Sequence, residues 1–173
     1  MINITLPDGS VRQYEAGVTS MQIAESISAG LARNVLSAKV NGEVWDADRP
    51  IANDSLVQLL TWRDKDGKMT FWHSTAHLMA EAIEAVYPGV KFGTGPAIDD
   101  GFYYDIDPGE HKISEADFKK IEDKMLELAR QKNKFVRQDI TKADALKYFT
   151  DKGDEYKLEL IEKRGENLSL IHI

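Results

Sequence analysis

The sequence contains no cysteine among its 173 residues, which excludes a disulfide framework and any cysteine-ligated zinc site within the chain. It also lacks an apolar run long enough to cross a bilayer, and no basic segment followed by an apolar one opens it as in a secretory signal. Apolar residues make up 42% of the composition, which is enough to build ordinary hydrophobic cores. We therefore expect a folded, cytoplasmic protein without a membrane partner.

Positive charge is also scarce, since 22 Lys and Arg stand against 29 Asp and Glu and the net charge is −7. A protein that binds nucleic acid by bulk electrostatics needs an excess of Lys and Arg, so this composition argues against a free-standing protein of that kind. One local exception is the segment 128–138, whose basic residues have no acidic neighbour: Arg130, Lys132, Lys134 and Arg137. A solvated helix end with favourable C-terminal cations accounts for them, and an RNA contact is the alternative.

The segment 1–62 has the pattern of a small α+β unit. Apolar and polar residues alternate over 2–6, as in a half-buried strand, and a Pro-Asp-Gly turn follows. Thr19 is positioned to cap a helix, and Asn41-Gly42 predicts a second hairpin before an apolar strand at 56–60. The order of hairpin, helix, hairpin and strand is that of a ubiquitin-like β-grasp fold.

Two stretches of this unit, Ile4-Thr5-Leu6-Pro7-Asp8-Gly9-Ser10 and Val40-Asn41-Gly42-Glu43, resemble a TGS domain. Such domains occur in threonyl-tRNA synthetases, in stringent-response nucleotide synthetases and in some GTPases, so this resemblance alone implies an interaction module rather than a chemistry. The segment 63–69 that follows is charged, contains glycine and has no apolar periodicity, which predicts an interdomain linker.

The segment 70–167 predicts a second α+β domain. Thr70 is positioned to cap a helix that carries an apolar face at helical spacing and ends at Pro88-Gly89. Further elements alternate along the chain, with strand-like runs at 101–106, 135–140 and 156–161 and helix starts at Ser114 and Thr141. The helices are sufficient to cover a sheet but the strands are few, so this domain is predicted to be incomplete.

His73 and His77 are four residues apart on the predicted helix, so their rings point the same way and can converge on one group. Three interpretations are open for such a pair: hydrogen-bonded polar residues at the edge of a core, two ligands of a metal, or a site that positions and deprotonates a water. Zinc needs further ligands, and neither His111, His172 nor any carboxylate has ligand spacing to the pair. Ser74 occupies the place of the base in an H-E-x-x-H metalloprotease helix, so we assign no metal.

A glycine loop, Gly93-Thr94-Gly95-Pro96, and an aromatic segment, Asp99-x-Gly101-Phe102-Tyr103-Tyr104-Asp105, follow the histidine pair. Each motif is weak by itself, because the loop lacks the third glycine of a dinucleotide-binding motif and aromatic residues also suit a core. In this order the three motifs resemble the editing domain of bacterial-type threonyl-tRNA synthetases, and the TGS-like unit before them favours the same family. The resemblance extends from Ile4 to about Ile161.

The resemblance implies an enzyme that ligates threonine to tRNA(Thr) using ATP, and whose second domain hydrolyses serine mischarged on that tRNA. It implies that His73 and His77 orient the attacking water or the terminal ribose, and that Lys157 stabilises negative charge or donates a proton. It also implies that Gly95 and Tyr104 line the substrate pocket. Spacing alone favours an exposed strand position for Lys157 and leaves Tyr104 as a possible core residue.

The family's proteins extend beyond this chain. Their editing domain continues into a strand with a cysteine and a further histidine, and a ligase core that is expected to hold ATP, magnesium and zinc follows. The resemblance therefore implies an amino-terminal fragment without a cofactor of its own, which charges no tRNA alone and is not expected to edit alone, and a homodimeric full-length enzyme. Residues 168–173 do not resemble the family and match the translated end sequence of transposon-based sequencing libraries, so we expect a non-native tail there and exclude His172 from the site. A genuine divergent tail is the alternative, and the nucleotide sequence would distinguish the two.

Two other functions remain open. A non-catalytic module could hold RNA or a partner protein through the β-grasp unit and the basic segment, and histidine-dependent ester hydrolysis would argue against it. A small hydrolase or metalloprotein built on the histidine pair ranks last, because further metal ligands are missing.

Overall fold

The computed structural model describes residues 1–163 and 167–172 of the chain. The chain divides into two compact units, Met1–Trp72 and His73–Ile173. Both units contain helices and strands, which confirms the predicted α+β class. In the described part of the chain, no helix has both the length and the apolar content that are needed to cross a bilayer.

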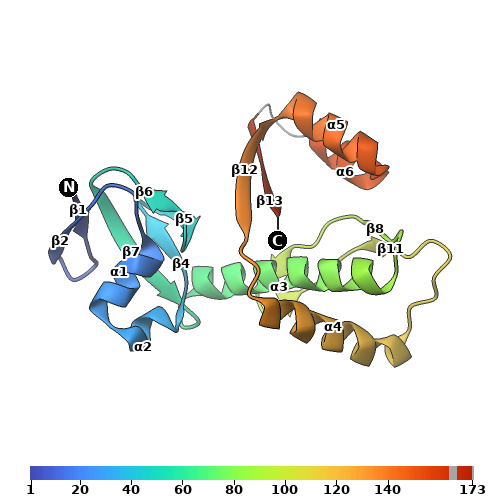
Figure 1. Ribbon diagram of the computed structural model, residues 1–173, viewed down its shortest axis with the longest axis horizontal. Coiled ribbons are helices and arrows are strands. Elements are labelled where there is room, and N and C mark those ends of the chain that lie inside the picture. Colours follow the sequence, from blue (N-terminus) through green and yellow to red (C-terminus); the bar gives the residue numbers. More distant parts are fainter. Residues whose placement is uncertain (164–166, 173) are drawn as a thin grey trace. The chain divides into compact units, whose positions relative to one another are not determined.

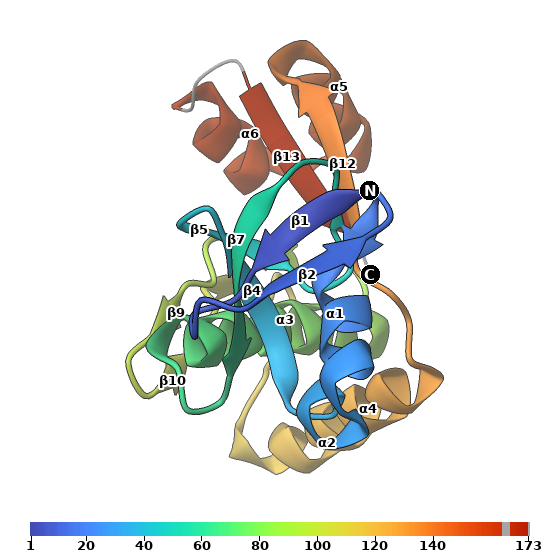
Figure 2. The same cartoon turned by 90° about the vertical axis from the view of Figure 1, so that its left-hand side faces the viewer.

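The first unit is a five-stranded sheet with helices packed against it (Figures 1 and 2). Its elements are β1 (Ile2–Thr5), β2 (Val11–Tyr14), β3 (Val18–Thr19), α1 (Ser20–Ile27), α2 (Ala29–Ala32), β4 (Val35–Val40), β5 (Glu43–Asp46), β6 (Pro50–Ile51) and β7 (Ser55–Thr61). The sheet order is β2-β1-β7-β4-β5, in which β1 and β7 are parallel and the other neighbours antiparallel. This arrangement confirms the predicted β-grasp fold.

The core of this unit lies between α1 and the sheet. Ile4 and Val57 from central strands and Ile23 from α1 are fully buried. Thr19 caps α1 as predicted, because its hydroxyl accepts from the Gln22 N–H at 3.2 Å and the Gln22 side chain accepts from the Thr19 N–H at 2.9 Å. Patterns over a few neighbouring residues were therefore sufficient to predict the fold of this unit.

The helix start predicted at Thr70 is wrong, because helix α3 (Lys65–Val86) begins earlier and includes most of the segment 63–69 that was predicted to be a linker. Gly67 allows the first turn of this helix to lie directly against the end of β7, since a Cβ atom there would be 2.1 Å from the Thr61 carbonyl oxygen. Thr70, the predicted cap, lies within the helix, and its hydroxyl donates to a carbonyl one turn earlier. The charged segment has no apolar periodicity, so its sequence did not indicate a helix. The first turn of this helix packs against the end of β7.

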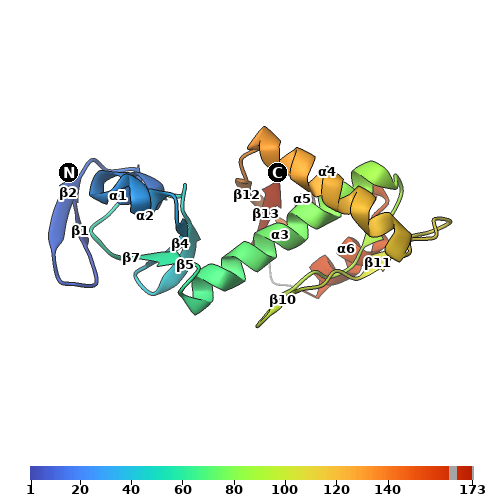
Figure 3. The same cartoon turned by 90° about the horizontal axis from the view of Figure 1, so that it is seen from below.

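The second unit packs long helices and short ladders around its own core (Figures 1 and 3). It holds α3 from His73 on, β8 (Lys91–Phe92), β9 (Ala97–Ile98), β10 (Gly101–Phe102), β11 (Ile106–Asp107), the 3-10 turn η1 (Glu115–Asp117), α4 (Phe118–Gln131), β12 (Val136–Thr141), α5 (Lys142–Lys152), α6 (Glu155–Glu162) and β13 (Asn167–His172). The ladders β8–β11, β9–β10 and β12–β13 are all antiparallel. α4 lies along α3, and Ile83 packs with Phe92 and Ile121 in the core.

The strand predicted at 156–161 is a helix, α6, and this correction matters most for the site. Asp154 is its N-cap and accepts from the Lys157 N–H at 3.1 Å. An N-cap carboxylate directly after Gly153, the left-handed residue that ends α5, favours a new helix over a strand. The strand predicted at 101–106 is likewise interrupted, into β10 and β11.

The remaining expectations concern the ends of α4 and of the chain. Arg130 lies in the last turn of α4, and Lys132 caps the helix with a left-handed φ of 54°, as expected for a solvated helix end. Of the tail expected at 168–173, residues 168–172 belong to β13, and Ile173 lies outside the described residues.

Candidate active site

The two histidines of α3 contact each other directly. Nε2 of His73 and Nε2 of His77 are 3.1 Å apart, and the rings meet edge to face with centroids separated by 4.7 Å. One ring must donate and the other accept, so at least one of the two is neutral. His73 is exposed and His77 half-buried, so the pair has one member that meets solvent and one that is shielded from it.

The environment of His77 favours the neutral imidazole. Burial lowers the pKa of His77 to about 4, and the nearby charges of His73 and Lys157 act in the same direction. At pH 7 this side chain is therefore neutral, and one of its ring nitrogens carries a lone pair that can accept a proton, as a general base requires.

We expect His77 to titrate near pH 4 in an NMR pH titration of the chain, below its ordinary value of 6.5. The unfolded chain then binds more protons than the folded chain between these two values, so the free energy of unfolding should fall as the pH is lowered through this window. Because His77 is partly exposed and its interactions are screened, the expected loss is about 1–2 kcal/mol. A His77→Gln variant should lose this part of the pH dependence in urea denaturation, and a midpoint at 6.5 or above would contradict the assignment.

Lys157 reaches the same region from α6. Its Nζ donates to the Gly93 carbonyl at 2.7 Å and lies 5.6 Å from the centre of the Tyr104 ring. Burial lowers the pKa of Lys157, and the charge of Asp154 opposes that effect. Lys157 is therefore a half-buried helix residue, and the exposed strand position that spacing favoured is wrong.

The glycine loop and the aromatic segment are joined in an extension of the β8–β11 ladder. The Gly93 N–H donates to the Asp105 carbonyl at 2.8 Å, and the Asp105 N–H donates to the Thr94 carbonyl at 2.9 Å. Gly95 then lies against the ring of Tyr104, because a Cβ atom at Gly95 would be 2.4 Å from two ring carbons. Burial raises the pKa of Tyr104, so its hydroxyl remains protonated at neutral pH.

The structure thus brings all five residues predicted from the sequence to one region. His73 contacts His77, Lys157 acts on His77 and lies over Tyr104, and Tyr104 packs on Gly95. Their individual chemical roles stay predictions. Among the described residues, no group of three or more His, Asp or Glu side chains is arranged to hold a metal ion.

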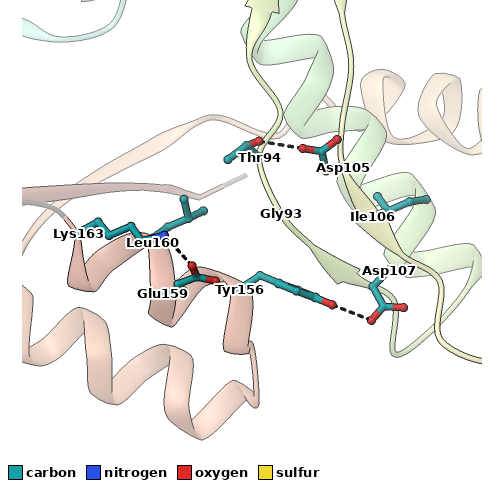
Figure 4. A pocket seen from close by; sticks show the side chains of 9 residues that line it. All are labelled: Gly93, Thr94, Asp105, Ile106, Asp107, Tyr156, Glu159, Leu160 and Lys163. Atoms are coloured by element: carbon teal, nitrogen blue, oxygen red, sulfur yellow. Dashed lines mark hydrogen bonds and ion pairs between the residues drawn. The ribbon is translucent and has the colours of Figure 1, made fainter.

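A cavity of about 380 Å³ adjoins Gly93, whose carbonyl Lys157 binds (Figure 4). It is lined by Gly93, Thr94, Asp105, Ile106, Asp107, Tyr156, Glu159, Leu160 and Lys163. Within it the Thr94 hydroxyl donates to Asp105 at 3.1 Å and the Tyr156 hydroxyl donates to Asp107 at 3.0 Å. Sequence reasoning missed Tyr156 and Asp107, since their only signal was adjacency to Lys157 and to the aromatic segment.

Comparisons with known proteins agree with both halves of the chain. Residues 2–61 match the family model of the TGS domain.

The chain is 67% identical over 162 residues to a threonine–tRNA ligase of Cytophaga hutchinsonii, covering 94% of this chain and 25% of that protein. It is 64% identical over 163 residues to the protein of the same name from Parabacteroides distasonis, with coverage of 94% and 25%. It is 58% identical over 167 residues to that from Porphyromonas gingivalis, with coverage of 96% and 26%. The chain spans about a quarter of the length of these relatives, and the matched part is their amino-terminal quarter.

Proposed function

We propose an editing role for this chain, whose residues 2–61 are a TGS domain and which is homologous to the amino-terminal quarter of threonine–tRNA ligases. In this role the second unit hydrolyses the ester of serine wrongly attached to threonine tRNA. The observation that carries the proposal is the 3.1 Å contact between His77 and His73, together with Lys157, which binds the Gly93 carbonyl and lies over Tyr104.

The need for such a reaction follows from the chemistry of the two amino acids. Serine keeps the hydroxyl of threonine and lacks only its methyl group, which is worth about 1–3 kcal/mol of discrimination. A ligase that needs greater accuracy has to remove the wrong product in a second step. Hydrolysis of an aminoacyl ester requires a positioned water, a proton acceptor and stabilisation of the developing negative charge.

Each requirement has a candidate in the site. His77 accepts the proton of the attacking water, with His73 sharing the proton across their 3.1 Å contact. The Lys157 ammonium has three N–H groups, of which one is bound to Gly93, so donors remain for the developing oxyanion or the leaving ribose oxygen. Tyr104 against Gly95 forms a rigid wall that excludes the extra methyl of threonine.

The ligation reaction is proposed for the parts of the protein beyond this quarter. Threonine, tRNA(Thr) and ATP are its proposed substrates, with magnesium and zinc held in the same ligase core. A cytoplasmic homodimer is the form in which we propose that the complete enzyme works.

A chimera tests the editing proposal. Residues 1–163 of this chain replace the matching segment of the Cytophaga hutchinsonii ligase, and the release of amino acid from Ser-tRNA(Thr) and Thr-tRNA(Thr) is compared. We expect serine to be released faster than threonine, and a ligase truncated by the same segment to release neither above the uncatalysed rate. Equal release by the chimera and by the truncated ligase would argue for a non-catalytic module.

A further inference from the structure

Two consecutive side chains at the start of α6 hold the helix to strands that are far away in the sequence. The Tyr156 hydroxyl donates to Asp107 at 3.0 Å, across 49 residues, and Lys157 Nζ donates to the Gly93 carbonyl at 2.7 Å, across 64 residues. Figure 4 shows the Tyr156 side chain extending from α6 to Asp107. The position of Lys157 in the site is therefore linked to how α6 lies on the β8–β11 ladder.

The register of this ladder explains why these contacts are adjacent. Lys91 and Asp107 are directly opposite each other, and Phe92 is buried in the core of the second unit. Because side chains alternate along a strand, Lys91 and Gly93 lie on the face opposite to Phe92. Tyr156 and Lys157 thus contact positions of the ladder that lie about two residues apart along it.

The other polar contact at the start of α6 is weaker. Glu155 and Lys91 are 3.6 Å apart, and the Glu155 side chain is 80% exposed. An exposed ion pair of this kind is screened by solvent and restricts motion little. Tyr156 is less exposed, at 41%, and its bond to Asp107 is shorter, at 3.0 Å, and joins a protonated hydroxyl to an ionised carboxylate, which makes it the better restraint.

The hydrogen bond between Tyr156 and Asp107 shifts the pKa of both partners. The Gly109 N–H and then the Tyr156 hydroxyl hold the pKa of Asp107 below its ordinary value. Donation to Asp107 raises the pKa of Tyr156. At neutral pH the hydroxyl therefore stays protonated and the carboxylate ionised, which keeps the contact in place across the range where ester hydrolysis is measured.

We propose that Tyr156 and Asp107 are positioning residues, whose hydrogen bond fixes α6 on the β8–β11 ladder and thereby holds the Lys157 ammonium against the Gly93 carbonyl and over Tyr104. Their importance for editing rests on the function proposed above, whereas the positioning itself is a property of this chain. Neither side chain touches the reacting atoms in this role. Tyr156→Phe removes only the hydroxyl and leaves the ring in place.

The test uses His77 as a reporter of where the Lys157 charge lies. The ionisable groups that act on His77 are His73 on the same helix and Lys157 from α6, and Asp154 acts in turn on Lys157. Removing a positive charge near a histidine makes protonation easier, so Lys157→Met should raise the midpoint of His77 in an NMR titration, by less than burial lowers it. Tyr156→Phe should raise the His77 midpoint by a smaller amount than Lys157→Met does.

A double variant distinguishes a change in the position of Lys157 from a wider loss of structure in the second unit. In the presence of Lys157→Met, Tyr156→Phe should not shift the His77 midpoint further, because the Lys157 charge that acts on His77 is already absent. Tyr103→Phe is the matched control, since Tyr103 is also exposed and lies in the same unit, and it should leave His77 at the wild-type midpoint. An unchanged midpoint in Tyr156→Phe, or an equal shift in the presence and absence of Lys157, would overturn the proposal.

The same variants in the chimeric ligase distinguish the two proposals. If serine release is present, Tyr156→Phe should lower it about 3- to 30-fold and change its pH profile in step with the His77 midpoint, as expected for a supporting residue rather than a reacting one. If the wild-type chimera releases no serine while the coupled His77 shifts are observed, the editing function fails and the positioning stands. If release is present and Tyr156→Phe alters neither the rate nor the titration, the positioning fails and the editing function stands.

Discussion

Replacing His77 with alanine in the chimeric ligase is expected to lower the rate of serine release by about 10²- to 10⁴-fold, the range typical for loss of a positioned acid or base. The reason is that His77 is neutral at pH 7 and is the shielded member of the pair. His73→Ala should have an effect of the same order, since its Nε2 is 3.1 Å from that of His77 and shares the proton. Single-turnover release from Ser-tRNA(Thr) measures both effects.

The control for these variants is His111→Ala. The His111 ring contacts the Pro88 carbonyl at 3.0 Å and the ring of Tyr87, and neither Pro88 nor Tyr87 is one of the five predicted site residues. It should leave the rate near that of the wild type. Release at the wild-type rate by His73→Ala, in a protein that circular dichroism shows to be folded, would make the assignment of the histidine pair wrong.

Gly95→Ala is expected to lower the free energy of unfolding of the second unit by about 1–3 kcal/mol, the usual cost of forcing an extra carbon into a packed site. The added Cβ would lie 2.4 Å from two ring carbons of Tyr104, closer than such atoms approach. The ring cannot move away freely, because it packs edge-on against the buried Phe92 at 5.5 Å and lies beneath Lys157. Urea denaturation followed through the NMR signals of Tyr104 and Phe92 measures the loss.

Gly30→Ala is the matched control for that substitution. Gly30 lies in α2, and a Cβ there would meet only the Ser28 hydroxyl at 3.9 Å. Alanine is favoured over glycine in a helix, so this variant should be as stable as the wild type or more stable. If both variants were equally stable, the close packing of Tyr104 on Gly95 would be contradicted.

Local sequence patterns were sufficient for the first unit. Thr19 and Gln22 form a capping box, Asn41-Gly42 forms a hairpin turn, and alternating strands place Ile4 and Val57 in the core. Each of these signals operates over a few residues, so the chain alone specifies it. The same holds for the Ser114 and Thr141 helix starts in the second unit.

Where contacts between distant segments decide the conformation, local reading failed. The start of α3 depends on Gly67 meeting Thr61 at the end of β7, and no periodicity in the charged segment indicates that contact. The segment 156–161 has apolar residues that suit a strand or a helix, and the cap at Asp154 decides for the helix.

The sequence by itself determined the β-grasp unit and the two histidines on one helix, because turns, caps and i, i+4 spacing are encoded in neighbouring residues. Only the tertiary structure showed that Lys157 lies on a helix and contacts Gly93 and Tyr104, and that Tyr156 on the same helix is bonded to Asp107. Those contacts cross 64 and 49 residues, and they depend on how α6 packs on the β8–β11 ladder. Packing of this kind is a property of the folded surface, so the spacing of residues along the chain carries no record of it.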